Sequence, residues 1–169
     1  MTSQHRRPFS RPCSRRCATA LGLLVAAAST FTLPAHADSV AAPPLAAHQQ
    51  ECAACHLAYP PGLLPASSWQ RLMDNLPKHF GTDASVDAAT QKQLSAWLAS
   101  NAGTFKKVAR NPAPPEDRIS KSAWFVREHH EVAPAVWKRA SVGSAGNCAA
   151  CHTGAAQGRY SEHDVRIPK

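Results

Sequence analysis

No segment of this 169-residue sequence is apolar over the roughly 20 residues that a membrane-spanning helix needs. The longest apolar stretch, residues 18–33, is too short and contains Thr30 and Thr32. Five arginines precede it, and Ala35-His36-Ala37 after it matches the A-x-A pattern of a cleavage site. We therefore expect residues 1–37 to be a secretory signal peptide, with no stable membrane insertion once it is removed. The alternative is a retained anchor.

Cysteine is absent outside the predicted signal peptide and two short motifs. Of the six cysteines, Cys13 and Cys17 lie in the signal, and the other four belong to the motifs described below. No thiol therefore remains for a structural disulfide, although exported proteins often depend on disulfides. The remaining chain of about 130 residues is long enough for one small domain with a modest core.

A large excess of positive charge is also absent from the predicted mature chain. The full sequence has a formal net charge of +8, but five of its 19 lysines and arginines lie in residues 1–37. The remaining 14 basic residues are balanced by 11 acidic residues, which leaves a net charge of +3. This near balance argues against nucleic-acid binding through bulk charge.

Alternating strand patterns are absent, and the sequence predicts a mainly α fold with extensive loops. Residues 38–47 are rich in alanine and proline, which predicts a flexible leader, and prolines predict loops at 59–65 and 111–115. Helical spacing and capping residues predict a helical turn at 48–51, a helix from Trp69 capped by Ser67 or Ser68, a helix capped by Asp83 or Ser85, and a helix over 123–132. We expect a single domain over residues 48–169.

The pentapeptide Cys-Ala-Ala-Cys-His occurs twice, at residues 52–56 and 148–152. C-x-x-C-H is the attachment signature of a c-type haem, in which each thiol adds to one haem vinyl group and the histidine is the proximal iron ligand. We therefore expect two covalent haem c groups with the attachment residues Cys52, Cys55, Cys148 and Cys151 and the proximal ligands His56 and His152. The alternatives are a zinc site of four thiolates and a thioredoxin-like dithiol. Neither needs a histidine after each pair, and the pairs are much farther apart than in zinc modules.

Methionine is scarce, which limits the choice of distal iron ligands. Apart from Met1 the chain contains only Met73, so at most one haem can be His/Met, and His/His is the simpler hypothesis for both. At 100° per residue, His129 lies on the apolar side of its predicted helix, and His79 lies on the flank of another apolar face. We expect these two histidines to be the distal ligands.

Other roles remain open for these residues. His129 is alternatively a histidine packed against an aromatic core, and His79 a histidine that interacts with a helix dipole. Met73 is central on its apolar stripe and is expected in the core. His48 lies beside the predicted flexible leader and His163 in a charged tail, so neither is favoured as a ligand.

Longer stretches around the motifs carry a family resemblance. The residues concerned are Glu51 to His56 with the extension Ala58-Tyr59-Pro60-Pro61-Gly62-Leu63-Leu64-Pro65, then Ser68-Trp69, Leu72-Met73 and His79-Phe80-Gly81, and further on Trp124 to His129, Asn147 to His152 and Val165-Arg166-Ile167-Pro168. In these stretches the chain resembles the bacterial dihaem cytochrome c family, whose best-studied member reduces a small oxygen-binding monohaem cytochrome.

The resemblance implies a mainly helical domain with two bis-histidine haems, in which His79 and His129 correspond to the distal histidines. It does not assign either histidine to a particular haem, and the adjacent His130 leaves an ambiguity of one residue. It also implies redox partners, either a small monohaem cytochrome c or a membrane b-type cytochrome.

No Ser/His/Asp grouping or phosphate-binding loop accompanies the motifs. We therefore expect a periplasmic protein, not an enzyme, that relays single electrons through its two haems. The alternative is a peroxidase-like haem enzyme or a gas-binding sensor with one open axial position. Lys106, Lys107 and Arg110, or Lys138 and Arg139, are candidates for docking a redox partner, ordinary solvated charge being the alternative.

Overall fold

The computed structural model describes residues 42–169, which all belong to one compact unit spanning residues 35–169. The predicted signal peptide, residues 1–37, and its cleavage site lie outside the described residues. Within the described part, no helix has both the length and the apolar character needed to cross a membrane.

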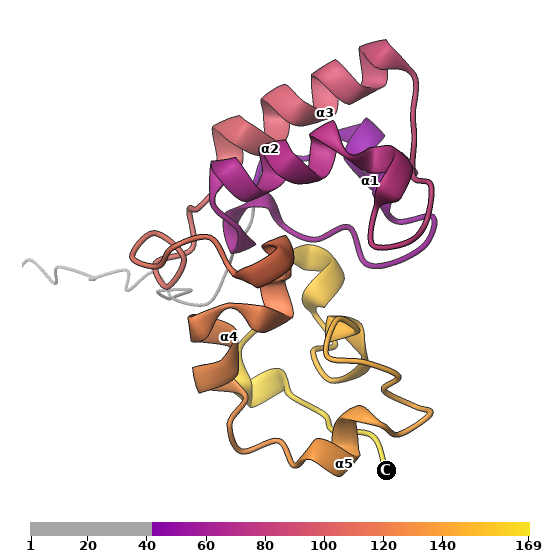
Figure 1. Ribbon diagram of the computed structural model, residues 1–169. Helices are drawn as coiled ribbons and strands as arrows, with labels where there is room; N and C mark the ends of the chain where they lie inside the picture. The colour runs from indigo at the N-terminus through magenta and orange to yellow at the C-terminus, as the bar shows by residue number, and fades with distance from the viewer. Residues whose placement is uncertain (1–41) are drawn as a thin grey trace, which may run out of the picture. The chain divides into compact units, whose positions relative to one another are not determined.

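Short helices and loops make up the described chain (Figure 1). The α-helices are α1 (Ala46–Cys52), α2 (Ala66–Asp74), α3 (Ala88–Asn101), α4 (Ala123–Glu128) and α5 (Pro134–Trp137). Single 3-10 turns lie at Pro61–Leu63, Leu76–Lys78, Pro115–Asp117, Ile119–Lys121, Cys148–Ala150, Ala155–Gln157 and Glu162–Asp164. Residues 42–169 contain no strand, only two isolated β-bridges, so the prediction of a mainly α fold with extensive loops is confirmed.

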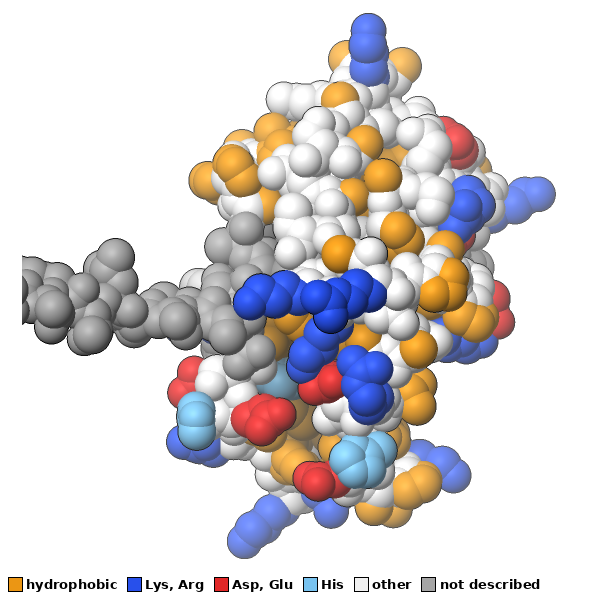
Figure 2. Space-filling model, turned by 90° about the vertical axis from the view of Figure 1, so that its left-hand side faces the viewer, with side chains coloured by type: hydrophobic (Ala, Val, Ile, Leu, Met, Phe, Trp, Pro, Cys, Tyr) orange, Lys and Arg blue, Asp and Glu red, His pale blue; other side chains and the backbone are white. Residues whose placement is uncertain are grey.

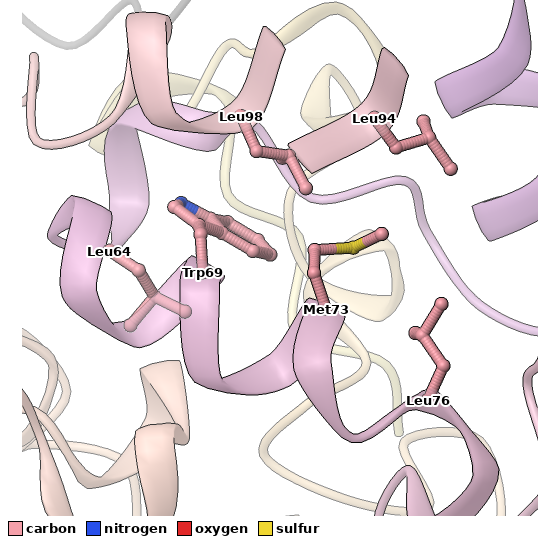
Figure 3. Close-up of a cluster of buried hydrophobic side chains, with 6 residues drawn as sticks. All are labelled: Leu64, Trp69, Met73, Leu76, Leu94 and Leu98. Carbon is pink, nitrogen blue, oxygen red and sulfur yellow. The ribbon is translucent and has the colours of Figure 1, made fainter. Parts of the chain in front are cut away.

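The larger hydrophobic cluster lies between α2 and α3. Figure 3 shows Trp69 and Met73 of α2 facing Leu94 and Leu98 of α3. Leu64 and Leu76 complete this cluster, and the Trp69 indole nitrogen donates a 2.7 Å hydrogen bond to the Pro61 carbonyl oxygen. Met73 is only 5 % exposed, in agreement with its predicted place in the core.

A second, smaller cluster consists of Leu63, Val108, Trp124 and Phe125. Leu63 belongs to this cluster while its neighbour Leu64 belongs to the first, and Ile119 packs against both. The loop that follows the first motif therefore contributes to both buried clusters, which joins the two parts of the core.

The ends of the helices differ in several places from the sequence predictions. Helix α2 begins directly after Pro65 and has no side-chain cap, because Ser68 lies inside the helix and is fully buried. Helix α3 is capped by Asp87, whose carboxylate accepts hydrogen bonds from the amides of Ala89 and Thr90, instead of by Asp83 or Ser85. Helix α4 is capped by Ser122 and begins at Ala123 as predicted, but it ends at Glu128, four residues earlier than predicted.

The start of the described chain is more ordered than the predicted leader over residues 38–47. Leu45 and Ala47 pack against the first cluster, and α1 begins at Ala46. The Trp97 indole nitrogen donates a 3.1 Å hydrogen bond to the carbonyl oxygen of Pro43. The apolar contacts of these residues with α3 outweigh the local effect of alanine and proline, which was all that the composition of the segment could indicate.

Candidate functional site

The two Cys-Ala-Ala-Cys-His motifs place their thiols at or near the surface without forming disulfides. Cys52 ends α1, Cys148 begins a 3-10 turn, and all four motif cysteines are free thiols. Burial raises the pKa of Cys52 and of Cys148 to about 11, with the charge of Glu51 adding to the shift at Cys52. Residues 42–169 hold no group of three or more side chains arranged to bind a metal ion, so the four-thiolate zinc site lacks structural support.

Each motif histidine has one of the two predicted distal histidines next to it. The ring centres of His56 and His79 are 6.1 Å apart, with an angle of 24° between the ring planes. The ring centres of His129 and His152 are 6.0 Å apart, with an angle of 76°. The structure therefore places His79 beside the first motif and His129 beside the second, a pairing that the sequence had left open.

The separation of each pair matches two imidazoles that share one metal ion. An imidazole nitrogen bonds a first-row metal at about 2 Å, so two imidazoles on opposite sides of one ion have ring centres roughly 6 Å apart. Both observed distances agree with this value. The two pairs thus have the spacing that two axial ligands of one haem iron require.

Local structure places His129 accurately at the end of α4. It is the C-cap residue, and its Nδ1 lies 2.9 Å from the carbonyl oxygen of Phe125. Its ring stacks on the Phe125 ring at 3.9 Å between centres. The side chain of the adjacent His130 is 72 % exposed, so the ambiguity between these two neighbours is resolved by burial.

A tight turn presents His79 to the first motif. The residue follows the 3-10 turn Leu76–Lys78, and its carbonyl oxygen accepts a 3.0 Å hydrogen bond from the amide of Thr82. Phe80 (φ 51°) and Gly81 (φ 96°) turn the backbone in the left-handed region, which glycine adopts without steric cost. Phe80 is 44 % exposed, because it lies in this turn, beyond the end of the helical segment.

The hydrogen bonds of His56 and His129, and the lowered pKa values of His79 and His152, suit neutral metal ligands. Nδ1 of His56 lies 2.7 Å from the Leu57 carbonyl oxygen, and Nδ1 of His129 lies 2.9 Å from the Phe125 carbonyl oxygen. Because these contacts use Nδ1, Nε2 of both rings remains available to bind a metal. Nδ1 of His79 and of His152 is buried without a hydrogen-bond partner among the described residues. Burial lowers the pKa of His79 and His152, and the neighbouring histidine of each pair adds to this effect. Neutral imidazole is the form that binds a metal.

A cavity of about 530 Å³ lies beside the second pair, within the size range of cofactor pockets. His129, His152, Cys148 and Cys151 all line it. Its apolar walls come from Leu63, Phe105, Ile119, Trp124, Phe125, Val132, Trp137, Ala145, Tyr160, Val165 and Ile167. A flat, mostly apolar group attached to the two thiols fits this lining. The residues around the second motif therefore fit a haem.

The remaining sequence candidates lie elsewhere. His48 is 4 % exposed and packs on Trp97 at 4.7 Å between ring centres, so it is a core residue of α1. His163 is exposed.

Two of the basic docking candidates have partners within the chain. Lys107 forms a 2.5 Å ion pair with Glu128, and the Arg139 guanidinium donates a 2.7 Å hydrogen bond to the Pro168 carbonyl oxygen. Figure 2 shows a face on which lysine and arginine side chains gather beside acidic side chains.

Two tyrosines were not recognised as site residues from the sequence. The chain contains only these two, and each packs on a motif histidine: Tyr59 on His56 at 5.0 Å and Tyr160 on His152 at 5.4 Å between ring centres. Tyr59 follows its histidine by three residues, a short distance that points to such a contact. No comparable sequence signal places Tyr160 against His152.

Comparisons with known proteins agree with the site. Residues 48–160 match the family model described as dihaem cytochrome c, and this range contains both motifs and all four paired histidines. The chain is similar to a solved diheme cytochrome c from Rhodobacter sphaeroides, with 44 % identity over 68 % of this chain and 94 % of that chain and a TM-score of 0.61. It is also similar to a solved diheme cytochrome type c from Shewanella baltica, with 33 % identity over 75 % of this chain and 95 % of that chain and a TM-score of 0.65. No curated protein sequence matches the chain.

Proposed function

Because this chain belongs to the dihaem cytochrome c family and so carries two covalently bound haem c groups, we propose that it relays single electrons through two bis-histidine haems in the periplasm. Haem-based electron transfer is the typical activity of this family, and catalysis is not. The observation that carries the proposal for this chain is the pair of histidine separations, 6.1 Å and 6.0 Å, one at each motif.

The chain's residues hold and shield the haems. Each haem supplies an iron that takes up and releases one electron at a time. Thioether bonds from Cys52 and Cys55, and from Cys148 and Cys151, would attach the two groups. His56 with His79 and His129 with His152 would fill both axial positions, which leaves no open site for a substrate or a gas.

The environment of the second pair favours fast electron exchange without a change in coordination. The Phe125 ring stacks on His129, and Trp137 lies 5.9 Å from it between ring centres. These contacts hold the His129 ring in place. The carbonyl oxygen of Phe125 accepts a hydrogen bond from Nδ1–H of His129, which fixes the tautomer and increases the basicity of the ligand nitrogen Nε2.

The experiment that tests bis-histidine ligation is the addition of carbon monoxide to the purified, dithionite-reduced holoprotein. An unchanged visible spectrum is expected, because both irons then have two strong protein ligands. A spectral change corresponding to about half of the haem would contradict the proposal. It would indicate one open or labile axial position and would favour a gas-binding or peroxidase-like protein instead.

Export to the periplasm is supported by the basic and apolar residues at the N-terminus and by the two covalent attachment motifs. Fractionation of cells that express the full chain tests this part of the proposal. The haem-bearing protein is expected in the periplasmic fraction, with an N-terminus near Asp38. Haem protein that remains in the membrane fraction would contradict cleavage.

The proposed partner is another redox protein, either a small monohaem cytochrome c or a membrane b-type cytochrome. Of the docking candidates, Lys107 and Arg139 are engaged within the chain, whereas Lys106, Arg110 and Lys138 form no ion pair with any described residue. These three are therefore the better candidates.

Neutralising Lys106, Arg110 and Lys138 should weaken the salt dependence of the association rate with an acidic monohaem cytochrome c. An unchanged salt dependence would assign docking to another surface.

A further inference from the structure

Tyr59 contacts the first motif and the backbone that leads into the second. Its ring stacks on the ring of His56 at 5.0 Å between centres, with an angle of 24° between the planes. Its hydroxyl donates a 2.6 Å hydrogen bond to the carbonyl oxygen of Gly146, which lies 87 residues farther along the chain. Gly146 precedes Cys148 by two residues. One side chain thus joins the proximal histidine of the first motif to the backbone that enters the second.

The hydrogen bond from Tyr59 continues directly to the second motif. The same carbonyl oxygen of Gly146 also accepts a 3.0 Å hydrogen bond from the backbone amide of Cys148. The contact is close because residue 146 has no side chain: a Cβ atom there would lie 3.3 Å from the Tyr59 hydroxyl oxygen. A short series of contacts therefore leads from His56 through the phenol ring and the Gly146 carbonyl to Cys148.

Tyr160 provides a natural comparison. Its ring lies 5.4 Å from that of His152, with an angle of 66° between the planes. Its hydroxyl donates a hydrogen bond of 3.5 Å to the carbonyl oxygen of Ala155, only five residues away. Tyr160 therefore packs on a proximal histidine as Tyr59 does, but its hydrogen bond stays within its own motif region.

We propose that Tyr59 is the bridge through which electrons pass between the two haem sites, by way of its ring, its hydrogen bond and the Gly146 carbonyl. This inference rests on the proposed two-haem function. In the step, the ferrous iron of one site loses one electron and the ferric iron of the other gains it. No bond to Tyr59 breaks and no proton moves.

The Tyr59 hydroxyl keeps its proton throughout this step. Burial raises the pKa of Tyr59 to about 12, and the charge that Cys148 carries as a free thiolate adds to the shift. In the attached state Cys148 is an uncharged thioether, which leaves burial as the cause. The phenol is therefore neutral at physiological pH and carries the proton that it donates in its hydrogen bond to Gly146.

The test is the rate of electron transfer between the two haems after rapid photochemical injection of one electron into the oxidised holoprotein. Tyr59→Phe keeps the ring on His56 but removes the hydrogen bond, and we expect the rate constant to fall at least several-fold. Tyr160→Phe is the matched control and should leave the rate unchanged. The midpoint potentials of both haems should be unchanged in both variants, which shows that the driving force is the same. The magnetic interaction between the ferric irons should also be unchanged, which shows that the distance between them is the same.

An equal rate in Tyr59→Phe and the natural protein would overturn the proposal, as would an equal slowing in Tyr160→Phe. If Tyr59→Phe does not fold with both haems, Gly146→Ala decides, because it crowds the hydroxyl while keeping the tyrosine. A slower transfer in Gly146→Ala supports the bridge, and an unchanged rate overturns it. Failure of the proposed function would be seen separately, as carbon monoxide binding by the natural protein.

Discussion

His129 and His130 are neighbours in the chain, yet only His129 has the surroundings of a metal ligand. Its ring stacks on Phe125 and lies 6.0 Å from His152 between ring centres, whereas the side chain of His130 is 72 % exposed. Nδ1 of His130 instead lies 2.8 Å from the Arg127 carbonyl oxygen. Position relative to the end of α4, and not residue type, separates the two, because His129 is the C-cap residue and His130 lies beyond it.

We predict that His129→Ala opens one axial position at the second haem. Half of the haem should become high-spin and bind carbon monoxide, because no other described histidine lies as close to His152. His130→Ala is the matched control and should retain the spectrum of the natural protein. Visible and EPR spectra measure both outcomes, and a fully low-spin His129→Ala would show that the assignment is wrong.

A second prediction, for His79, tests which histidines form each pair. The rings of His56 and His79 are nearly parallel, whereas those of His129 and His152 are nearly perpendicular. The angle between axial imidazole planes sets the splitting of the iron d orbitals, so the oxidised protein should give two distinct low-spin EPR signals. His79→Ala should remove the signal of the parallel pair only. Loss of the other signal would reverse the pairing.

At the scale of elements, α4 is short and depends on its cap. Ser122 is 4 % exposed, its Oγ accepts a 3.2 Å hydrogen bond from the Phe125 amide, and its hydroxyl donates a 2.7 Å hydrogen bond to the Ile119 carbonyl oxygen. These bonds hold the first turn of a six-residue helix whose C-cap is His129. A helix of this length has little stability of its own.

We expect Ser122→Ala to lower the free energy of unfolding by about 1–2 kcal/mol, the usual cost of losing a helix cap. Chemical denaturation of the holoprotein, followed by far-UV circular dichroism, measures this loss. Ser120→Ala is a suitable control, because the Ser120 side chain has no hydrogen bond with any described residue. Equal stability of the two variants would contradict the role of the cap.

The pair α2 and α3 carries the larger buried cluster and is expected to be the most stable part of the fold. Leu98 is 2 % exposed and packs among Trp69, Met73 and Leu64. Leu98→Ala leaves a cavity there and should cost about 2–5 kcal/mol in denaturation experiments. Val126→Ala, at a position that is 59 % exposed, should change the stability by no more than about 0.5 kcal/mol. A small loss for Leu98→Ala would mean that the cluster is not tightly packed.

At the scale of the whole molecule, the haems complete a small core. The first cluster contains six buried residues and the second only four, and the second borders the cavity of about 530 Å³. Trp124 and Phe125 of the second cluster and the half-buried Trp137 all line that cavity, so a haem placed there would extend this small cluster. The family's covalent haem is therefore a structural component of this region as well as its redox centre.

We predict that the double variant Cys148→Ala/Cys151→Ala loses the second haem and much of the order in residues 105–169. The haem content per chain, measured as the pyridine haemochrome, should fall to one half, and protease should cleave this region first. The variant Cys52→Ala/Cys55→Ala is the counterpart at the first motif, where the first cluster remains packed, and it should be less sensitive to protease. Equal resistance of the second-motif variant and the natural protein would contradict the structural role.

The mainly α architecture could be predicted from the sequence alone and is confirmed, because it depends on local patterns; the four attachment cysteines rest on an equally local pattern and stay a prediction. Five consecutive residues encode each haem attachment, and the period of apolar residues indicates α2, α3 and α4. Helix ends were less predictable: α4 ends at Glu128, where His129 adopts a non-helical backbone conformation, and Asp87 caps α3 although two other caps were available. That His79 and His129 bind iron stays a prediction.

Only the tertiary structure decided which groups from distant segments meet. The pairing of His56 with His79 and of His129 with His152 depends on how α2 and α4 lie relative to the motifs, and no local pattern contains that information. The hydrogen bond from Tyr59 to Gly146 joins positions 87 residues apart. The sequence by itself thus determined the cofactor and the two attachment motifs, because these are local patterns, while the packing of distant segments decided which histidines lie together and how the two motif regions are connected.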